Sequence, residues 1–378
     1  MQKRFVFARE DQPGADWQAR FAAGREAARR WYQGTGRADP PAAAECRTAL
    51  ARHMPELLGP YDQACGLVGD DPLAHCILSQ YRPAPVVHGC SQAVWLGDGG
   101  PALVRNYDFP LDLVSERFES TRWFGGEVIA KAQRPWGGCI DGMNADGLVA
   151  SLTAGGGSEQ GLGFAVILVL RHVLETCRTV REGVPALIRI PIALSQNVTL
   201  LDRAGDHATV FLGPGREPSV SRVPVCTNHQ DRIPPQPSAA MRCSLLRQET
   251  VQRALDDPAM TLPELARRFL APPVFSRRAS SATAYTAIYR PAEGRVDYVW
   301  PGRTVTQRIG RFEEQEYTHD FGELVAEDPR RLGFLPGQLS IPDGFDALGR
   351  DEIERLFYGT ADGAAAGDRP PPDPGRRG

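Results

Sequence analysis

The spacing of hydrophobic residues changes part-way along the chain. In the first part, apolar residues recur at helical spacing, which predicts helices at 16–32, at 42–58 and within 60–81. A Pro-Ala-Pro sequence at 83–85 then ends the helical pattern. We therefore expect residues 1–89 to form a helical segment.

The second part alternates short apolar runs with turns rich in Gly, Asn and Asp, a pattern typical of β-hairpins. Hairpins in two groups, with helices between them, predict an α+β domain rather than a doubly wound parallel sheet. The expected strands pair 93–96 with 102–106, 139–143 with 148–152, 193–201 with 207–212, and 284–290 with 295–300. The expected helices cover 162–179, 180–189 and 241–255.

These patterns divide the chain into three parts. The helical segment 1–89 precedes an α+β domain that we place at 90–357. The tail 358–378 consists largely of Gly, Ala, Pro and Asp, a composition that buries too little apolar surface to fold. We expect the tail to be disordered.

Composition and charge narrow the class of protein. Hydrophobic residues make up 42% of the 378 residues, enough for a globular core, and the net charge is only -3. The arginines are scattered, and Lys3 and Lys131 are the only lysines, so we expect no nucleic-acid partner. Residues 1–12 lack the apolar stretch of a signal peptide, and the longest apolar run, 164–170, is shorter than the roughly 20 residues of a membrane span. We expect a cytoplasmic protein without a membrane partner.

The eight cysteines are spread along the chain, with no CxxC pair and no Cys/His spacing of a zinc site. In a reducing compartment they would be mostly free thiols. We expect neither a metal nor another cofactor.

Cys90 has neighbours that distinguish it from the other cysteines. A single cysteine is usually a small buried hydrophobic residue. Here Gly89 precedes it, Ser91 follows it, and Arg105 and Asp108 lie at the end of the next expected strand. Because a hairpin folds back on itself, the three residues Cys90, Arg105 and Asp108 can share one end of a sheet. This arrangement favours a reactive thiol.

Two glycine-rich stretches are weaker candidates. Residues 97–101, Gly-Asp-Gly-Gly-Pro, resemble the loop around a trypsin-type serine, but the serine is absent and a tight turn explains the glycines. Residues 155–161 resemble a dinucleotide loop, but the third glycine is misplaced and no strand–turn–helix with a later acid follows. We interpret 155–161 as a flexible loop that borders a site.

Four motifs follow one another along the chain, together with a long helix that contains 171–175. The motifs are Gly89-Cys90-Ser91, Arg105-Asn106-Tyr107-Asp108, Gly142-Met143-Asn144 with Gly147-Leu148, and Cys226-Thr227-Asn228-His229. In these motifs and their order the chain is similar, over about 55–302, to the N-terminal nucleophile (Ntn) hydrolases of the choloylglycine hydrolase and penicillin acyltransferase group. Within that group it is most similar to isopenicillin-N acyltransferase and its autoproteolytic bacterial relatives.

The resemblance implies a fold and a reaction. The fold is a four-layer αββα sandwich, in which two antiparallel sheets lie between helix layers, with an N-terminal helical segment. The precursor would cut itself between Gly89 and Cys90 and free the α-amino group of Cys90. An α-amine has a pKa of about 7.7–8.0 and a thiol about 8.5, so the amine can take the thiol proton near neutral pH. One residue then supplies both nucleophile and base.

The resemblance also assigns supporting roles. Asp108 would hold the new amine, and Arg105 would favour the thiolate, although an ion pair between these two residues is an alternative. Asn228 would donate its side-chain amide to the oxyanion, a contribution of about 3 kcal/mol. The second oxyanion donor is expected to be a backbone N–H near Thr153 or Ala154.

The remaining candidates are less specific. Arg242 matches the late arginine that the group places near the nucleophile, and Tyr107 would line the pocket or pack. Asn144 could line the pocket too, but its place in a turn favours a structural role. Cys90 with His229 and Asn228 could form a papain-like triad. However, His229 and Asn228 are adjacent, and the side chains of adjacent residues on a strand point to opposite sides, which disfavours a triad. His88 could assist the cut, but a loop histidine is the simpler interpretation.

We therefore expect a cysteine enzyme that hydrolyses or transfers the acyl group of a linear amide or an acyl thioester. Segment 1–89 would stay bound after the cut because its apolar faces need a partner, and a homo-oligomer is compatible with the sequence. Two alternatives stay open. One is an uncut binding module in which Cys90 is inert and 1–89 caps the pocket. The other is a cysteine hydrolase that works without self-cleavage.

Overall fold

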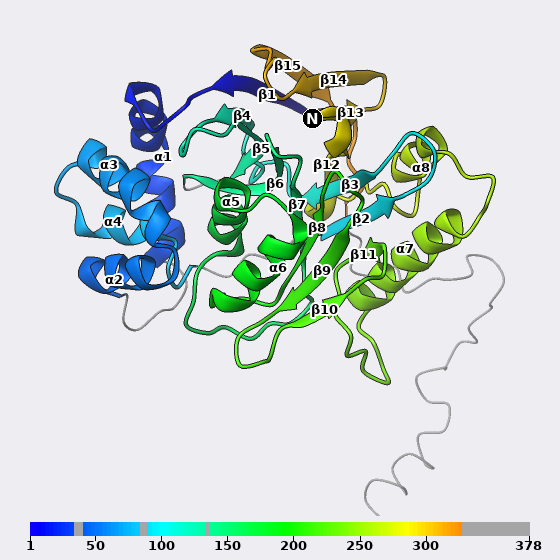
Figure 1. The fold of residues 1–378 in the computed structure, drawn as a ribbon, viewed down its shortest axis with the longest axis horizontal. Coiled ribbons are helices and arrows are strands. Elements are labelled where there is room, and N and C mark those ends of the chain that lie inside the picture. The colour runs from blue at the N-terminus through cyan, green and yellow to red at the C-terminus, as the bar shows by residue number, and fades with distance from the viewer. Residues whose placement is uncertain (34–40, 84–88, 134–135, 327–378) are drawn as a thin grey trace, which may run out of the picture. The chain divides into compact units, whose positions relative to one another are not determined.

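Two β-sheets lie face to face at the centre of the fold (Figure 1). The computed structural model describes residues 1–33, 41–83, 89–133 and 136–326, all within one unit. The larger sheet has the strand order β10-β9-β8-β7-β6-β5-β4-β1-β15, and the smaller has β11-β2-β3-β12-β13-β14. The strands are β1 Gln2–Arg9, β2 Gly89–Trp95, β3 Ala102–Phe109, β4 Arg117–Thr121, β5 Val128–Gln133, β6 Gly138–Asn144, β7 Val149–Ala154, β8 Gln196–Leu201, β9 His207–Leu212, β10 Ser219–Ser221, β11 Val225–Cys226, β12 Ala282–Arg290, β13 Arg295–Trp300, β14 Arg303–Arg308 and β15 Gln315–Asp320.

Helices cover the outer face of each sheet. The pair α5 and α6 packs on β6 to β9, and the pair α7 and α8 packs on β2, β3 and β11 (Figure 1). The layers therefore run helix, sheet, sheet, helix, which confirms the α+β, αββα prediction. The helices are α1 Ala15–Gln33, α2 Ala43–His53, α3 Leu58–Val68, α4 Pro72–Ser79, α5 Val166–Thr176, α6 Val180–Arg189, α7 Ala239–Leu255 and α8 Leu262–Phe269.

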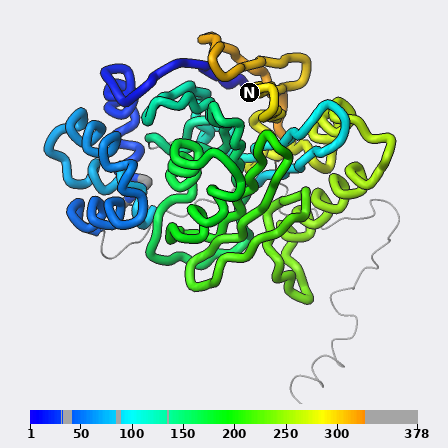
Figure 2. Tube along the Cα trace, in the orientation of Figure 1, coloured from blue at the N-terminus to red at the C-terminus, as the bar shows by residue number. Residues whose placement is uncertain are grey.

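The first residues correct the prediction of an entirely helical segment 1–89. They form β1, which pairs in parallel with β4 and antiparallel with β15, so the larger sheet is not purely antiparallel. The alternation of buried Phe5 and Phe7 with more exposed neighbours explains the strand. Figure 2 shows this N-terminal segment beside the last described strands.

The other sequence predictions hold with local corrections. The expected helix at 42–58 ends at His53, before Pro55, and the expected helix within 60–81 is two helices, α3 and α4. The four expected hairpins are present. Residues 327–357 of the expected domain and the tail 358–378 lie outside the described residues, as does His88.

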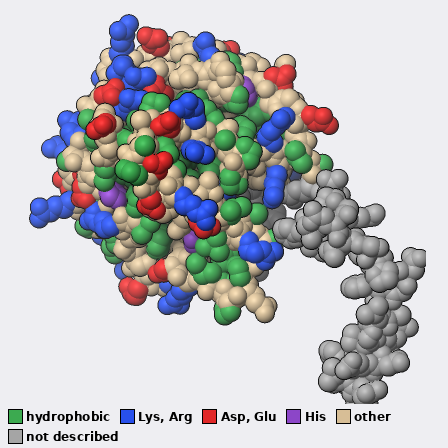
Figure 3. All heavy atoms as spheres, turned by 90° about the vertical axis from the view of Figure 1, so that its right-hand side faces the viewer, with side chains coloured by type: hydrophobic (Ala, Val, Ile, Leu, Met, Phe, Trp, Pro, Cys, Tyr) green, Lys and Arg blue, Asp and Glu red, His purple; other side chains and the backbone are tan. Residues whose placement is uncertain are grey.

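Two further features of the fold are the distribution of charge on its surface and the length and polarity of its helices. On the face shown in Figure 3, acidic and basic side chains are interspersed rather than gathered by sign. Among the described residues, every helix is too short or too polar to cross a membrane.

Candidate active site

The hairpin of β2 and β3 brings three of the sequence candidates together. Its register places Gly89 opposite Asp108 and Cys90 opposite Tyr107. Arg105, two residues before Tyr107, reaches across the hairpin so that its Nη2 lies 3.3 Å from the Sγ of Cys90. A Cβ built on Gly89 would lie 3.2 Å from the Cβ of Asp108, a separation that favours glycine before the cysteine. The hairpin prediction for Cys90, Arg105 and Asp108 is therefore correct in geometry.

The sulfur of Cys90 is fully buried. Burial raises the pKa of its thiol to about 11, while the Arg105 charge and the backbone N–H of Asp108 act in the opposite direction. The Asp108 carboxylate adds to the increase in the thiol pKa. In the uncut chain the thiol is therefore protonated at neutral pH.

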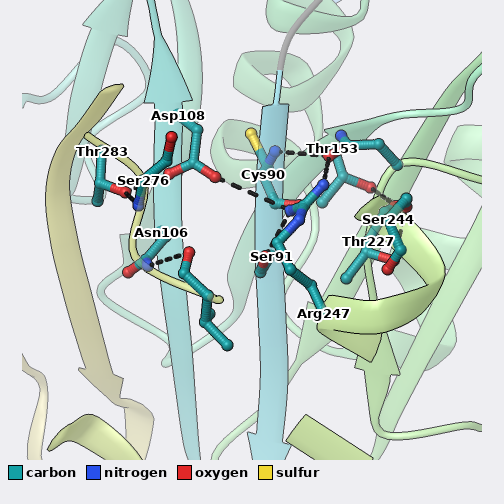
Figure 4. Close-up of polar contacts among 12 residues, drawn as sticks. Cys90, Ser91, Asn106, Asp108, Thr153, Thr227, Ser244, Arg247, Ser276 and Thr283 are labelled. Atoms are coloured by element: carbon teal, nitrogen blue, oxygen red, sulfur yellow. Dashed lines mark hydrogen bonds and ion pairs between the residues drawn. The ribbon is translucent and has the colours of Figure 1, made fainter. Parts of the chain in front are cut away.

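The backbone of Cys90 is held by side chains from outside its hairpin. Its N–H donates to Oδ1 of Asn228 over 2.8 Å. Arg247 donates to the carbonyl oxygen of Cys90 and to Oγ of Ser91, both at 2.6 Å, and to Oδ1 of Asn228 at 2.8 Å. Figure 4 shows Arg247 reaching from its helix to the strand that carries Cys90 and Ser91. Because Oδ1 of Asn228 accepts two N–H groups, Nδ2 is the atom of this side chain that can donate.

Arg247 occupies the place that the sequence analysis gave to Arg242. Arg242 lies on an exposed face near the start of α7, where Nη1 donates to the carbonyl oxygen of Pro237. Arg247 instead lies among the buried positions Ser244, Val251 and Ala254 of the same helix. An arginine inside the apolar stripe of a helix is a sequence signal that could have identified it.

Asp108 is buried beside the nucleophile. Its Oδ1 accepts a 2.6 Å hydrogen bond from Oγ1 of Thr283, and its Oδ2 lies 3.8 Å from Nη1 of Arg247. Burial raises the pKa of Asp108 to about 6, and Arg247, Thr283 and Arg105 limit the increase. The carboxyl group is therefore mostly ionised at pH 7.

The loop that carries Asn228 is fixed at its backbone. Nδ2 of Asn197 donates to the carbonyl oxygens of Thr227 and His229, both at 3.0 Å. The ring of His229 contacts Oγ of Ser244 at 2.9 Å, and Figure 4 shows Ser244 beside Thr227, on α7's side of the site. The structure does not bring His229 to the thiol, so the papain-like triad is not formed.

The predicted positions for the second oxyanion donor border this loop. Oγ1 of Thr153 donates to the carbonyl oxygen of Thr227 over 2.8 Å, and the carbonyl oxygen of Ala154 accepts from Asn197 at 3.3 Å. Thr153 belongs to β7 of the larger sheet, so its hydrogen bond to Thr227 ties the loop to that sheet. The Oγ1 of Thr153 thus donates to the loop, and the oxyanion donor predicted near Thr153 or Ala154 would have to be a backbone N–H.

The two other pocket candidates, Asn144 and Tyr107, make contacts that stabilise the fold. Asn144 accepts from the N–H of Leu148 and donates to the carbonyl oxygens of Leu174 and Cys177, so its side chain fixes the β6–β7 turn against α5. These contacts agree with the turn role that the sequence favoured for Asn144 over a place in the pocket. Tyr107 is fully buried, with its ring stacked on Phe109.

The glycine-rich loop packs closely on the candidate site. Gly156 has a φ of +79°, and a Cβ there would lie 2.9 Å from the carbonyl oxygen of Asn228. A cavity of about 330 Å³ opens between this loop and the residues that precede the hairpin. Its lining consists of Arg82, Pro83, Gln160, Gly161, Leu162 and Ala193. No group of three or more His, Cys, Asp or Glu in the described part of the chain could hold a metal ion.

The residue that forms an ion pair with Arg105 was not predicted from the sequence. The Nη1 of Arg105 lies 2.9 Å from Oδ2 of Asp141, and both side chains are fully buried. The sequence suggested Asp108 as the alternative partner of Arg105, whereas the partner in the structure is Asp141. Asp141 is the one charged residue in β6, a strand whose residues are all buried, and a charged residue in such a strand is a sequence signal for a buried partner.

The comparisons with known proteins address the family. The family model "Acyl-coenzyme A:6-aminopenicillanic acid acyl-transferase" matches residues 95–304. No curated protein matches the chain significantly. A penicillin V acylase structure from Agrobacterium tumefaciens has 15% identity and a TM-score of 0.41, covering 58% of this chain and 86% of its own. A mutant of the conjugated bile acid hydrolase from Clostridium perfringens has 13% identity and a TM-score of 0.42, and the match covers 64% of this chain and 99% of the hydrolase chain. The Caenorhabditis elegans ortholog of N-acylethanolamine-hydrolyzing acid amidase has 14% identity and a TM-score of 0.39, and the match covers 54% of this chain and 93% of the amidase chain.

The match to the family model extends over more than half of the chain. It covers the strand and loop motifs that follow Cys90, and the αββα layers agree with the resemblance drawn from those motifs. The chain therefore belongs to the acyl-coenzyme A:6-aminopenicillanic acid acyltransferase family, within the Ntn hydrolases, and is an enzyme that acts on amide bonds.

Proposed function

We propose that the protein is an autoproteolytic cysteine hydrolase or acyltransferase that cuts itself between Gly89 and Cys90. The observation that carries this proposal is the convergence of three side chains on one cysteine. Asn228 contacts the nitrogen of Cys90, Arg247 its carbonyl oxygen, and Arg105 its sulfur. A cysteine that only fills space needs none of these contacts.

The self-cut transfers the Gly89 acyl group from nitrogen to sulfur. The Sγ of Cys90 attacks the carbonyl carbon of Gly89, the S–C bond forms and the C–N bond breaks. The thiol proton passes to the departing nitrogen, and water then hydrolyses the thioester to release the Gly89 carboxylate. Oδ1 of Asn228 already accepts the N–H of that nitrogen, so the leaving group is held in place as it becomes an amine.

In the cut enzyme the same thiol attacks the substrate. The α-amine of Cys90 takes the thiol proton, because its usual pKa of about 7.7–8.0 suits a base at neutral pH. Asp108 and Oδ1 of Asn228 hold this amine, and Arg105 offsets the burial of the thiolate. Nδ2 of Asn228 donates to the oxyanion. An acyl-Cys90 intermediate forms and passes its acyl group to water or to an amine.

Segment 1–89 remains bound after the cut. Strand β1 lies between β4 and β15, and Phe5 and Phe7 are buried in the core. Each such phenylalanine stabilises the complex by about 1.5–3 kcal/mol. The two chains would therefore purify together.

The substrates would be linear N-acyl amides or acyl thioesters. The cavity of about 330 Å³ lies beside the glycine-rich loop that packs on Asn228, and it is large enough for part of such a molecule. Arg82 and Gln160 give it polar groups, and Leu162 an apolar one.

The intact mass under denaturing conditions tests this proposal, with Cys90→Ala beside the wild type. We expect two wild-type chains that meet at Gly89 and Cys90, and one uncut mutant chain. Incubation with N-acyl amides should then add the mass of one acyl group to the chain that begins at Cys90.

A single uncut chain in both samples would remove the amine from the mechanism. Alkylation of Cys90 would then separate the two alternatives. If substrate amides protect the Cys90 thiol from alkylation, the protein is an enzyme that works uncut. If the thiol does not react with the alkylating reagent, the protein is a binding module.

A further inference from the structure

A cluster of polar side chains is buried between the two sheets, next to Cys90. Arg105, Tyr285 and Tyr289 come from the smaller sheet, and Asp141 and Ser151 from the larger. All five have relative exposures of 1% or less. An apolar cluster of the same volume would often be equally stable or more stable, so a buried ion pair at this place requires another explanation.

The contacts of Arg105 give that explanation. Its Nη1 contacts Oδ2 of Asp141 at 2.9 Å, the carbonyl oxygen of Ile140 at 3.0 Å and Oγ of Ser151 at 3.2 Å. Its Nη2 points the other way and donates to the Sγ of Cys90 at 3.3 Å. Because the guanidinium is planar, fixing Nη1 also fixes the direction of Nη2.

Asp141 is itself held on both oxygens. The hydroxyl of Tyr285 donates to Oδ2, and the hydroxyl of Tyr289 donates to Oδ1. The Tyr289 hydroxyl also lies 3.4 Å from that of Tyr298. Although burial lowers the pKa of Arg105, the Asp141 carboxylate reverses this, and the pKa is raised overall. The guanidinium therefore keeps its charge in a dry environment.

We propose that Asp141, held by Tyr285 and Tyr289, is a positioning residue that presents Nη2 of Arg105 to the thiol of Cys90. Asp141 acts through Arg105 and does not touch the reacting atoms. This inference rests on the proposed function, since it assigns Asp141 a role in the same reaction. Ser151 completes the support, because its Oγ accepts from Arg105 and donates to Gln92 at 2.5 Å.

Two substitutions of Asp141 separate position from stability. Asp141→Leu removes the contacts to Arg105, and Asp141→Asn keeps an oxygen that can accept from Nη1. Asp297→Asn is the matched control, because Asp297 is also a buried aspartate paired with an arginine, on β13. The rate of carbamidomethylation of Cys90 by iodoacetamide is followed by peptide mass spectrometry from pH 6 to pH 10, and it reports a shift in the thiol pKa because each unit of increase lowers the rate about tenfold below that pKa. Thermal unfolding is measured in parallel.

We expect the apparent thiol pKa to rise by about one unit in Asp141→Leu, with a roughly tenfold loss of Cys90 reactivity near pH 7.5. Asp141→Asn should recover most of that reactivity, and Asp297→Asn should match the wild type. An unchanged thiol pKa in folded Asp141→Leu, accompanied only by a lower melting temperature, would show a purely structural role and overturn the proposal.

A second pair of changes covers the case in which Asp141→Leu does not fold. Tyr285→Phe with Tyr289→Phe removes both hydroxyl donors and keeps the carboxylate. We expect a smaller rise in the thiol pKa, and an unchanged value would again reject the positioning role. The intact mass of the wild type reports the self-cut independently. An uncut wild type with a thiol pKa that responds to Asp141 would reject the proposed function and retain the positioning role.

Discussion

The two sides of Cys90 are built differently. On the inner side, Arg105 and Asp141 lie between the sheets with no exposed side-chain surface. On the outer side, Asn228 comes from a loop and Arg247 from α7, and the Arg247 side chain keeps 12% exposure. On the inner side Arg105 contacts the sulfur of Cys90, whereas on the outer side Asn228 and Arg247 contact its backbone.

This difference separates two tasks. An electrostatic interaction is stronger between buried groups than between partly hydrated ones, so the inner side is suited to setting the charge of the thiol. The outer side holds the backbone of Cys90 next to the bond that we propose is cut, and Arg247 there is partly exposed. The following changes test this division on the outer side, since the changes at Asp141 address the inner side.

The largest effect is expected for Asn228→Asp, which keeps an oxygen acceptor and removes the amide donor. The oxygen can still accept from the nitrogen of Cys90, so self-cleavage should continue. Turnover of an N-acyl amide should fall by about 10²–10³-fold because the oxyanion loses a donor. The intact mass and the turnover rate, measured on one preparation, give the two results.

Asn228→Ala is the companion variant, since it removes both acceptor and donor. We expect slow self-cleavage as well as low turnover. Equal losses of self-cleavage in the Asp and Ala variants would contradict the assignment of the two tasks to the two ends of the amide.

An intermediate effect is expected for Arg247→Ala. Its contacts to Cys90, Ser91 and Asn228 are hydrogen bonds from a charged donor, worth about 1.5–3 kcal/mol each. Because water can replace part of these hydrogen bonds in the variant, we expect self-cleavage to slow by about 10- to 100-fold. The matched control is Arg242→Ala on the same helix, which should cut at the wild-type rate. A slow Arg242→Ala with a normal Arg247→Ala would reverse the structural assignment. The time course of precursor loss by mass spectrometry measures both.

The two arginines also show how far the sequence could predict the site. Cys90, Arg105 and Asp108 belong to one hairpin, so their proximity follows from local pairing rules. Arg247 comes from a helix far along the chain, and its place depends on which face of α7 is buried. The spacing of Ser244, Val251 and Ala254 marks that face in the sequence, but it does not show which strand the face packs against. Asp141 was missed for the same reason, because its partner lies on the opposite sheet.

The fold was predictable to a similar degree. Helix α6 was predicted with its observed bounds, because its apolar residues and its Thr179 cap are local signals. Strands β4 and β5 were not foreseen, and β1 was mistaken for part of a helical segment. β1 is stabilised by pairing with a strand more than 300 residues later, which no local pattern reveals.

The smallest effect concerns the pH dependence that Asp108 imposes. Its pKa is raised to about 6 by burial, and the hydrogen bond from Thr283 restrains that increase. Below this pKa the carboxyl is neutral and no longer attracts the amine of Cys90, so activity should fall further as the pH drops through about 6, beyond the loss that protonation of the amine causes at higher pH. Removal of the hydrogen bond in Thr283→Val raises the pKa of Asp108 further, so the acid limb of kcat/KM should move to higher pH by less than about one unit. Thr286→Val is the matched control, because Thr286 is buried on the same strand and donates to Asn106 instead. A limb that stays in place in Thr283→Val, or moves equally in Thr286→Val, would show that Asp108 does not set the acid limb.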